Sequence, residues 1–182
     1  QPASATPTWS DTLDTTDFGW HSQTLRQVIT ASTSGSRIRV TIPIGTSISN
    51  GGGYADNISI VKQSGTGPNG TETPTEILYG GASGFTGPKG GSIVSDWIDY
   101  EVVAGQTYLL CIDFTSGGGN DSFYHIFTGG EGAFLKGSAD SALLQQMPSG
   151  YSTLSNRTHV FNKLEVGVDQ VVNTDYIAEM SR

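Results

Sequence analysis

Short runs in which apolar and polar residues alternate dominate the chain, and most of them end at turn-forming residues. In the clearest run, 37–44, every second residue is isoleucine or valine: Ile38, Val40, Ile42 and Ile44. A two-residue period predicts a β-strand with one buried and one solvent-facing side. Pro43 lacks a backbone donor, so this strand is expected to end there or to lie at a sheet edge.

The other predicted strands are spread along the chain, at 23–30, 57–63, 76–79, 91–95, 97–102, 107–114, 123–127 and 159–168. The run 107–114 is apolar almost throughout, which predicts a central strand buried on both faces. One segment is helical in pattern instead, because Ser138 can cap a helix over 138–146 that Pro148 would end. We therefore expect an all-β fold, a two-sheet antiparallel β-sandwich with at most one short helix.

The 182 residues suffice for one such domain. Residues 1–8 form a proline-containing stretch of mostly small residues, which is typical of a linker. The sandwich is expected over 9–168, and 169–182 is expected to form a C-terminal tail that adds a strand or contacts a neighbour. The sequence shows no secretion signal and no run near the roughly 18 apolar residues of a membrane span, so we expect no membrane insertion.

The charge balance narrows the classes of partner. The net charge is −8, from 17 acidic and 9 basic residues. Nucleic acid and anionic membrane surfaces both require a basic face, so neither is expected as a partner. The remaining classes of partner are neutral polysaccharides, proteins and mineral ions.

The sequence predicts no catalytic residue and no cofactor. Cys111 lies inside the apolar run 107–114, where a lone cysteine is expected to serve as a small core side chain. The histidines His21, His125 and His159 could each meet a serine and an aspartate. Hydroxyl residues are so abundant here that no nucleophile and base stand out as a pair. We therefore expect that the chain is not an enzyme.

Several segments carry a family resemblance through their order and spacing: 24–28, 34–40, 77–81, 91–96 and 103–109. Together they resemble the β-sandwich accessory domain found beside the catalytic domain of some bacterial GDSL/SGNH-type esterases, over 23–112. The catalytic part of that family supplies a Gly-Asp-Ser block and a late Asp-x-x-His block, and neither occurs here. The resemblance therefore implies a sandwich of jelly-roll type and an accessory role, with no catalytic residue to carry over.

Aromatic rings beside flexible loops are the candidate sugar-binding residues, because flat rings stack on the apolar faces of pyranoses. The candidates are Tyr54, Phe85, Phe123 and Tyr124, with Tyr151 and Trp97 as further exposed rings. The glycine runs 51–53 and 117–119 are expected to bring Tyr54 and the Phe123–Tyr124 pair to one rim of the sandwich. The alternative is that these rings fill the core.

Arg37 and Arg39 share the polar face of their strand. They could hold the carboxylates or sulfates of an acidic glycan, or they could pair with acidic residues on neighbouring strands.

The sequence does not decide whether the protein binds a metal ion. Asp11, Asp14 and Asp17 recur every third residue, and such a stretch either binds a structural Ca²⁺ or is simply solvated.

Two functional hypotheses follow. The first is a non-catalytic carbohydrate-binding domain that recognises a polysaccharide or cell-surface glycan, outside the cell or exposed on a surface. The alternative is a structural spike, fibre or decoration protein of a phage-like particle or appendage. Such a protein would lie on the virion surface, could attach to host glycans and would form a homo-oligomer.

Overall fold

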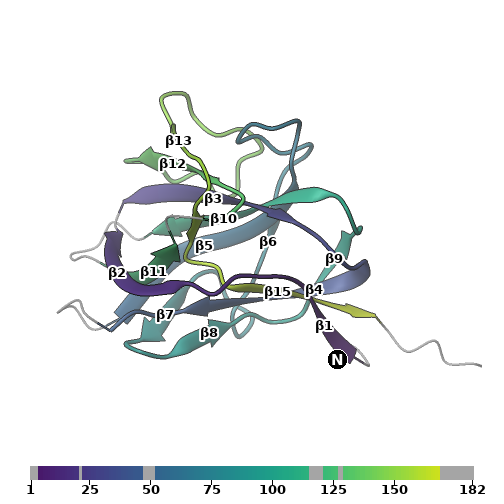
Figure 1. Cartoon of the computed structure of the whole chain (residues 1–182), viewed down its shortest axis with the longest axis horizontal. Coiled ribbons are helices and arrows are strands. Elements are labelled where there is room, and N and C mark those ends of the chain that lie inside the picture. Colours follow the sequence, from purple (N-terminus) through teal and green to yellow (C-terminus); the bar gives the residue numbers. More distant parts are fainter. Residues whose placement is uncertain (1–3, 21, 47–51, 115–120, 127–128, 169–182) are drawn as a thin grey trace, which may run out of the picture.

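The computed structural model describes residues 4–20, 22–46, 52–114, 121–126 and 129–168, and only the backbone at 14–20, 121–122, 124–126 and 168. Within these residues the regular elements are all strands. Every strand pair is antiparallel, and two sheets lie one above the other (Figure 1). This confirms the predicted all-β sandwich. The jelly-roll strand order stays a prediction.

The first sheet, the lower one in Figure 1, has five strands: β1 (Ser4–Ser10), β15 (Lys163–Val168), β4 (Gly35–Pro43), β8 (Ser92–Val94) and β9 (Ile98–Val102). β4 ends at Pro43, as its missing donor predicts. The side chains of Ile38, Val40, Ile42 and Ile44 are all fully buried. The face assignment made from the alternation is therefore confirmed.

The second sheet has seven strands: β13 (Ser152–Leu154), β12 (Ala133–Gly137), β3 (Gln23–Thr30), β10 (Thr107–Phe114), β5 (Gly52–Lys62), β6 (Thr75–Glu76) and β7 (Phe85–Pro88). A small third sheet joins β14 (Thr158–His159), β11 (Asp121–Ile126) and β2 (Asp14–Trp20). β10 is central and is buried from Tyr108 to Phe114, which confirms the expectation for the run 107–114.

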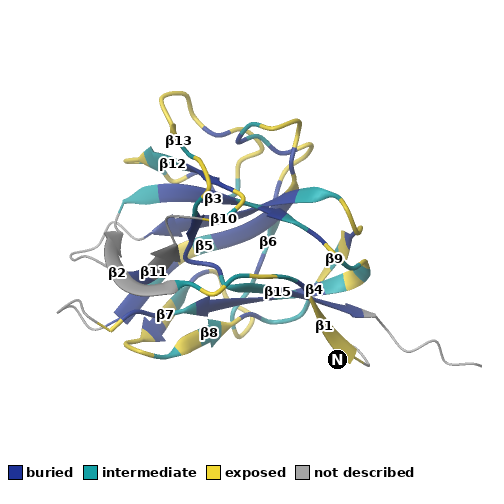
Figure 2. Ribbon diagram, viewed as in Figure 1, coloured by how far each residue is buried: buried dark blue, intermediate teal, exposed yellow. Residues whose placement is uncertain are grey.

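The main core lies between the two sheets, where the strands in Figure 2 are dark blue. A second, smaller apolar cluster lies on the outer face of the second sheet: Val61, Leu109, Cys111, Phe134, Ala142 and Met147. Cys111 is a fully buried free thiol, as predicted, and burial raises the pKa of this thiol to about 11. The second sheet is therefore covered on both sides, and its outer cover comes from the segment 138–150.

The segment 138–146 is not a helix, so this prediction was wrong. The chain makes turns there and lies across the outer face of the second sheet. Its carbonyl groups at Ser141, Leu144 and Gln145 accept hydrogen bonds from the side chain of Arg26. Hydrogen bonds to Arg26 thus occupy backbone carbonyl groups that would accept hydrogen bonds within a helix.

The segment 1–8 is not a linker in its described part. β1 begins at Ser4 and pairs with β15 over its whole length. Pro7 is tolerated because β1 is an edge strand, where one row of backbone groups faces solvent. The predicted tail 169–182 lies outside the described residues. The described part of the chain contains no helix with the length and apolar character of a membrane span.

Candidate binding groove

The outer face of the second sheet carries two neighbouring rows of side chains, set by the strand register. One row contains Val28, Leu109 and Val61, and the next contains Thr30, Thr107 and Gln63. The segment 138–150 covers and buries Leu109 and Val61, whereas Val28 is only half-buried. The outer face of the second sheet is therefore covered at Leu109 and Val61 and more open at Val28.

A groove of about 530 Å³ opens over this part of the sheet. Val28 and Phe134 give it an apolar floor, and Ala133 and Leu154, which pack in or against the main core, complete its apolar lining. Its remaining lining is largely neutral and polar: Thr30, Gln63, Thr66, Thr107, Thr153, Ser155 and Asn156. The volume falls within the range of about 300–1,000 Å³ that small-molecule sites occupy. An apolar floor with convergent hydroxyl and amide groups is the combination that such sites show.

An aromatic pair lies at the groove. Phe134 lines it, and the ring of Tyr151 stands edge-on to that of Phe134, with 5.7 Å between the ring centroids and 87° between the planes. Tyr151 is 38% exposed, whereas Phe134 is 7% exposed. Tyr151 does not itself line the groove, but its exposed ring packs against Phe134, which does.

Arg26 fixes one wall of the groove. Its side chain is fully buried, and its guanidinium donates hydrogen bonds to four carbonyl oxygens: Pro68 (2.8 Å), Ser141 (2.8 Å), Leu144 (2.6 Å) and Gln145 (3.2 Å). These carbonyls belong to two segments far apart in sequence, which Figure 1 shows as long loops above the second sheet. Gly65 and Thr66, which line the groove, precede Pro68 in one of them. The planar fork of an arginine can hold several acceptors at once, so Arg26 ties both segments to the sheet.

Asp113 also binds the segment 138–150, which covers the outer face of the second sheet. Its carboxylate accepts hydrogen bonds from the Thr24 hydroxyl and from the backbone N–H groups of Ser141 and Ala142, both at 3.0 Å. Burial raises the pKa of Asp113 to about 6, and a contact with the Asp140 side chain adds to the rise. The three hydrogen bonds lower the pKa, but they only partly offset the desolvation.

Gln27 and Glu131 shape the opposite side of the groove. The amide of Gln27 donates hydrogen bonds to the carbonyls of Gly132 (2.8 Å) and Arg157 (3.2 Å) and accepts one from the His159 N–H (2.9 Å). This fixes the chain directly after the turn that contains Ser155 and Asn156. Glu131 is exposed at the rim and accepts hydrogen bonds from the Thr30 N–H (2.6 Å) and hydroxyl.

The residues predicted from the sequence lie mostly elsewhere. Phe123 is fully buried, so the expectation of an exposed sugar-stacking ring at this position was wrong. Its ring packs against Gly53, where a Cβ would come within 2.8 Å of it. Gly53 thus leaves room for the Phe123 ring in the core. The segments carrying Tyr54 and Phe123 do meet, but around a buried ring.

The other three predicted rings differ in their surroundings. Phe85 is half-buried in β7 and packs on Tyr79, with 5.1 Å between the ring centroids. Tyr54 is half-buried within β5 rather than at a loop tip. The side chain of Tyr124 lies outside the described residues. The groove itself was missed because β12 and β13 were not predicted, although the short apolar run 133–135 was their signal.

The arginines of β4 are paired across strands. The Nε atom of Arg37 lies 2.9 Å from the Asp99 carboxylate. Arg39 donates to both carboxylate oxygens of Glu165 at 3.1 Å, and its guanidinium lies 4.7 Å from the centroid of the Trp97 ring. The cross-strand alternative is therefore confirmed, because acidic residues of this chain already occupy the positions that an acidic glycan would need.

No metal site is visible in the part of the chain whose side chains are described: no three histidine, cysteine or acidic residues there are grouped to hold an ion. Asp11 is half-buried, and the side chains of Asp14 and Asp17 lie outside the described residues. The structural Ca²⁺ stays a prediction.

Comparison with known proteins does not assign this chain to a family. No protein-family model matches the chain, and no curated protein is significantly similar to it. One similar solved structure contains the cysteine protease and lectin-like domains of Cwp84, a surface-layer-associated protein of Clostridium difficile. The match has 11% sequence identity and a TM-score of 0.49, and it covers 80% of this chain and 32% of the other.

Proposed function

We propose that this domain is a non-catalytic carbohydrate-binding domain that holds a polysaccharide in the groove on the outer face of the second sheet. The observation that carries the proposal is the pairing of an apolar, aromatic-edged floor with a rim of neutral polar side chains. A pyranose has apolar C–H faces and a belt of hydroxyl groups, so it needs both kinds of contact.

The chemistry of the rim supports this ligand class. Threonine, serine, asparagine and glutamine side chains can each donate and accept hydrogen bonds, which matches the dual character of sugar hydroxyls. The rim is also held in place before any ligand arrives, because Arg26 and Gln27 bind the backbone of its flanking segments. A preformed site loses less conformational entropy on binding.

The same lining favours binding over hydrolysis. A glycosidase of the usual kind needs two carboxyl groups on either side of the bond it cleaves. Glu131 is the one carboxylate among the described residues that line the groove.

We propose a location outside the cell or on a surface, where polysaccharides are encountered. The accessory role implied by the resemblance to esterase-associated sandwich domains fits such a binder.

Two tyrosine variants distinguish the groove from the rim predicted by the sequence. Tyr151→Ala is expected to weaken polysaccharide binding about fivefold, because one stacking ring contributes about 1 kcal/mol beyond its area. Tyr54→Ala, a matched change in β5, is expected to leave the affinity within about twofold. A glycan array identifies the polymer, and calorimetric titration of both variants gives the affinities. The opposite ranking would place the site at the β5 end of the sandwich.

The structural alternative makes a different prediction about assembly. A binding domain is expected to be monomeric, whereas a spike, fibre or decoration protein needs contacts between copies. Size-exclusion chromatography with light scattering at micromolar concentration measures this directly. A stable closed oligomer that binds no glycan on the array would favour the particle component over the binding domain.

A further inference from the structure

The basic residues of the chain are scarce, and four of the eight described ones lie next to carbonyl or acidic groups away from the groove. There are nine lysines and arginines in 182 residues. Arg26 is buried among carbonyl groups, while Arg37, Arg39 and Lys163 lie next to acidic side chains on the first sheet. Arg157 follows Asn156 in the chain, but its side chain is not part of the groove lining. The described lining of the groove contains no cationic side chain.

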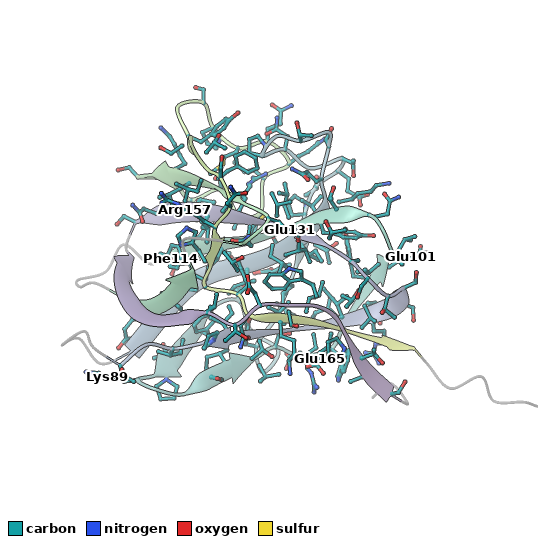
Figure 3. All side chains as sticks on the ribbon, viewed as in Figure 1. Lys89, Glu101, Phe114, Glu131, Arg157 and Glu165 are labelled. Carbon is teal, nitrogen blue, oxygen red and sulfur yellow. The ribbon has the colours of Figure 1, made fainter. Side chains whose placement is uncertain are left out.

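The one charge in this lining is negative. Glu131 stands at the rim next to Thr30 and Gly132, and both of its carboxylate oxygens accept hydrogen bonds from Thr30. These bonds fix the position of the carboxylate at the rim. Figure 3 shows Glu131 beside the second sheet, well away from Glu165 on the first.

From this distribution of charge we infer that the groove selects uncharged polysaccharides and rejects those that carry carboxylate or sulfate groups on the bound sugars. The inference rests on the proposed function and adds the chemical class of the ligand. A carboxylate entering the groove would lose water without gaining a cationic partner. It would also lie close to the Glu131 carboxylate, in a protein whose net charge is already −8.

The wild-type protein tests the inference with polymer pairs that differ only in charge. Xyloglucan, galactomannan and mixed-linkage β-glucan are each titrated beside a sample in which the primary hydroxyl groups have been oxidised to carboxylates. We expect the oxidised polymer to bind at least about tenfold more weakly than its neutral parent, a difference of about 1.4 kcal/mol. The gap should narrow at high salt, because screening weakens the repulsion.

Glu131→Gln locates the source of the discrimination. The variant removes the charge while its amide can still accept from one Thr30 donor. We expect the ratio of the affinity for the neutral polymer to the affinity for the oxidised one to fall severalfold. Glu101→Gln is the matched control, because Glu101 is exposed at the far right of Figure 3 and does not line the groove. It removes the same net charge and should leave the discrimination unchanged.

Each outcome has one meaning. Equal binding of both members of a pair, or preference for the oxidised member, overturns the inference and leaves the proposed function standing. A discrimination that disappears equally in Glu101→Gln and Glu131→Gln also overturns it, because the effect would then come from net charge alone. Binding to no polymer of either kind overturns the proposed function itself. The wild-type comparison is decisive even if Glu131→Gln is poorly folded.

Discussion

Replacing Arg26 with alanine is expected to destabilise the domain by about 3–4 kcal/mol and to abolish binding in the groove. The change removes the donor for four buried or half-buried carbonyl groups at once. An acceptor left without a partner in the interior costs about 1–3 kcal/mol, and part of this sum is recovered because a buried charge is no longer desolvated. The freed segments would no longer hold the wall near Thr66.

Chemical denaturation of the variant measures the loss of stability, and titration of a bound polysaccharide measures the loss of the site. Arg37→Ala is the matched control, because Arg37 pairs with an exposed carboxylate at the surface and such pairs contribute at most about 1 kcal/mol. Arg26→Lys should recover little, since an ammonium group cannot reach four acceptors arranged for a planar fork. Equal destabilisation by the two alanine variants would mean that Arg26 does not anchor the cover.

Asp113 is expected to make the domain less stable as the pH rises from about 4 to about 6. Its native pKa of about 6 lies above the ordinary value of an aspartate, so the folded protein binds this proton more tightly than the unfolded chain does. Stability contributed by the protonated form is present below pH 4 and is lost as the native carboxyl ionises near pH 6. A shift of this size corresponds to roughly 2–3 kcal/mol.

The variant Asp113→Asn isolates this contribution from that of the other acidic residues. Asparagine keeps an acceptor oxygen for the Thr24 hydroxyl and the Ser141 N–H, and its amide can donate towards Asp140, as the protonated acid does. The stability of the wild type relative to this variant should therefore fall between pH 4 and pH 7. Urea unfolding at several pH values gives the difference. A constant difference across this range would show that the native pKa of Asp113 is not raised.

The local sequence pattern was sufficient for two central strands of the core, β4 and β10. The alternation of 37–44 assigned the buried face of β4, and the apolar run 107–114 identified the central strand β10. Both are determined by neighbours two residues apart, so the information lies within one strand. The low charge and the scarcity of basic residues likewise follow from composition alone.

The binding site could not be found in this way. Its wall depends on Arg26, whose guanidinium binds a carbonyl 118 positions away at Leu144. In the sequence, Arg26 is one polar position in a predicted strand. Nothing in the local pattern indicates that another segment of the chain covers it. The segment 138–146 has a helical pattern, yet its backbone groups are taken by Arg26 and Asp113.

The sequence by itself thus determined an all-β sandwich, its main core strands and its acidic character, because these depend on short-range periodicity and composition. The tertiary structure alone decided which rings are exposed and which face of a sheet is open. Phe123 is buried because Gly53 on another strand leaves room for it, whereas Tyr151 stays exposed with its ring packed edge-on against Phe134. Such outcomes depend on contacts between distant segments, which a pattern along the chain does not encode.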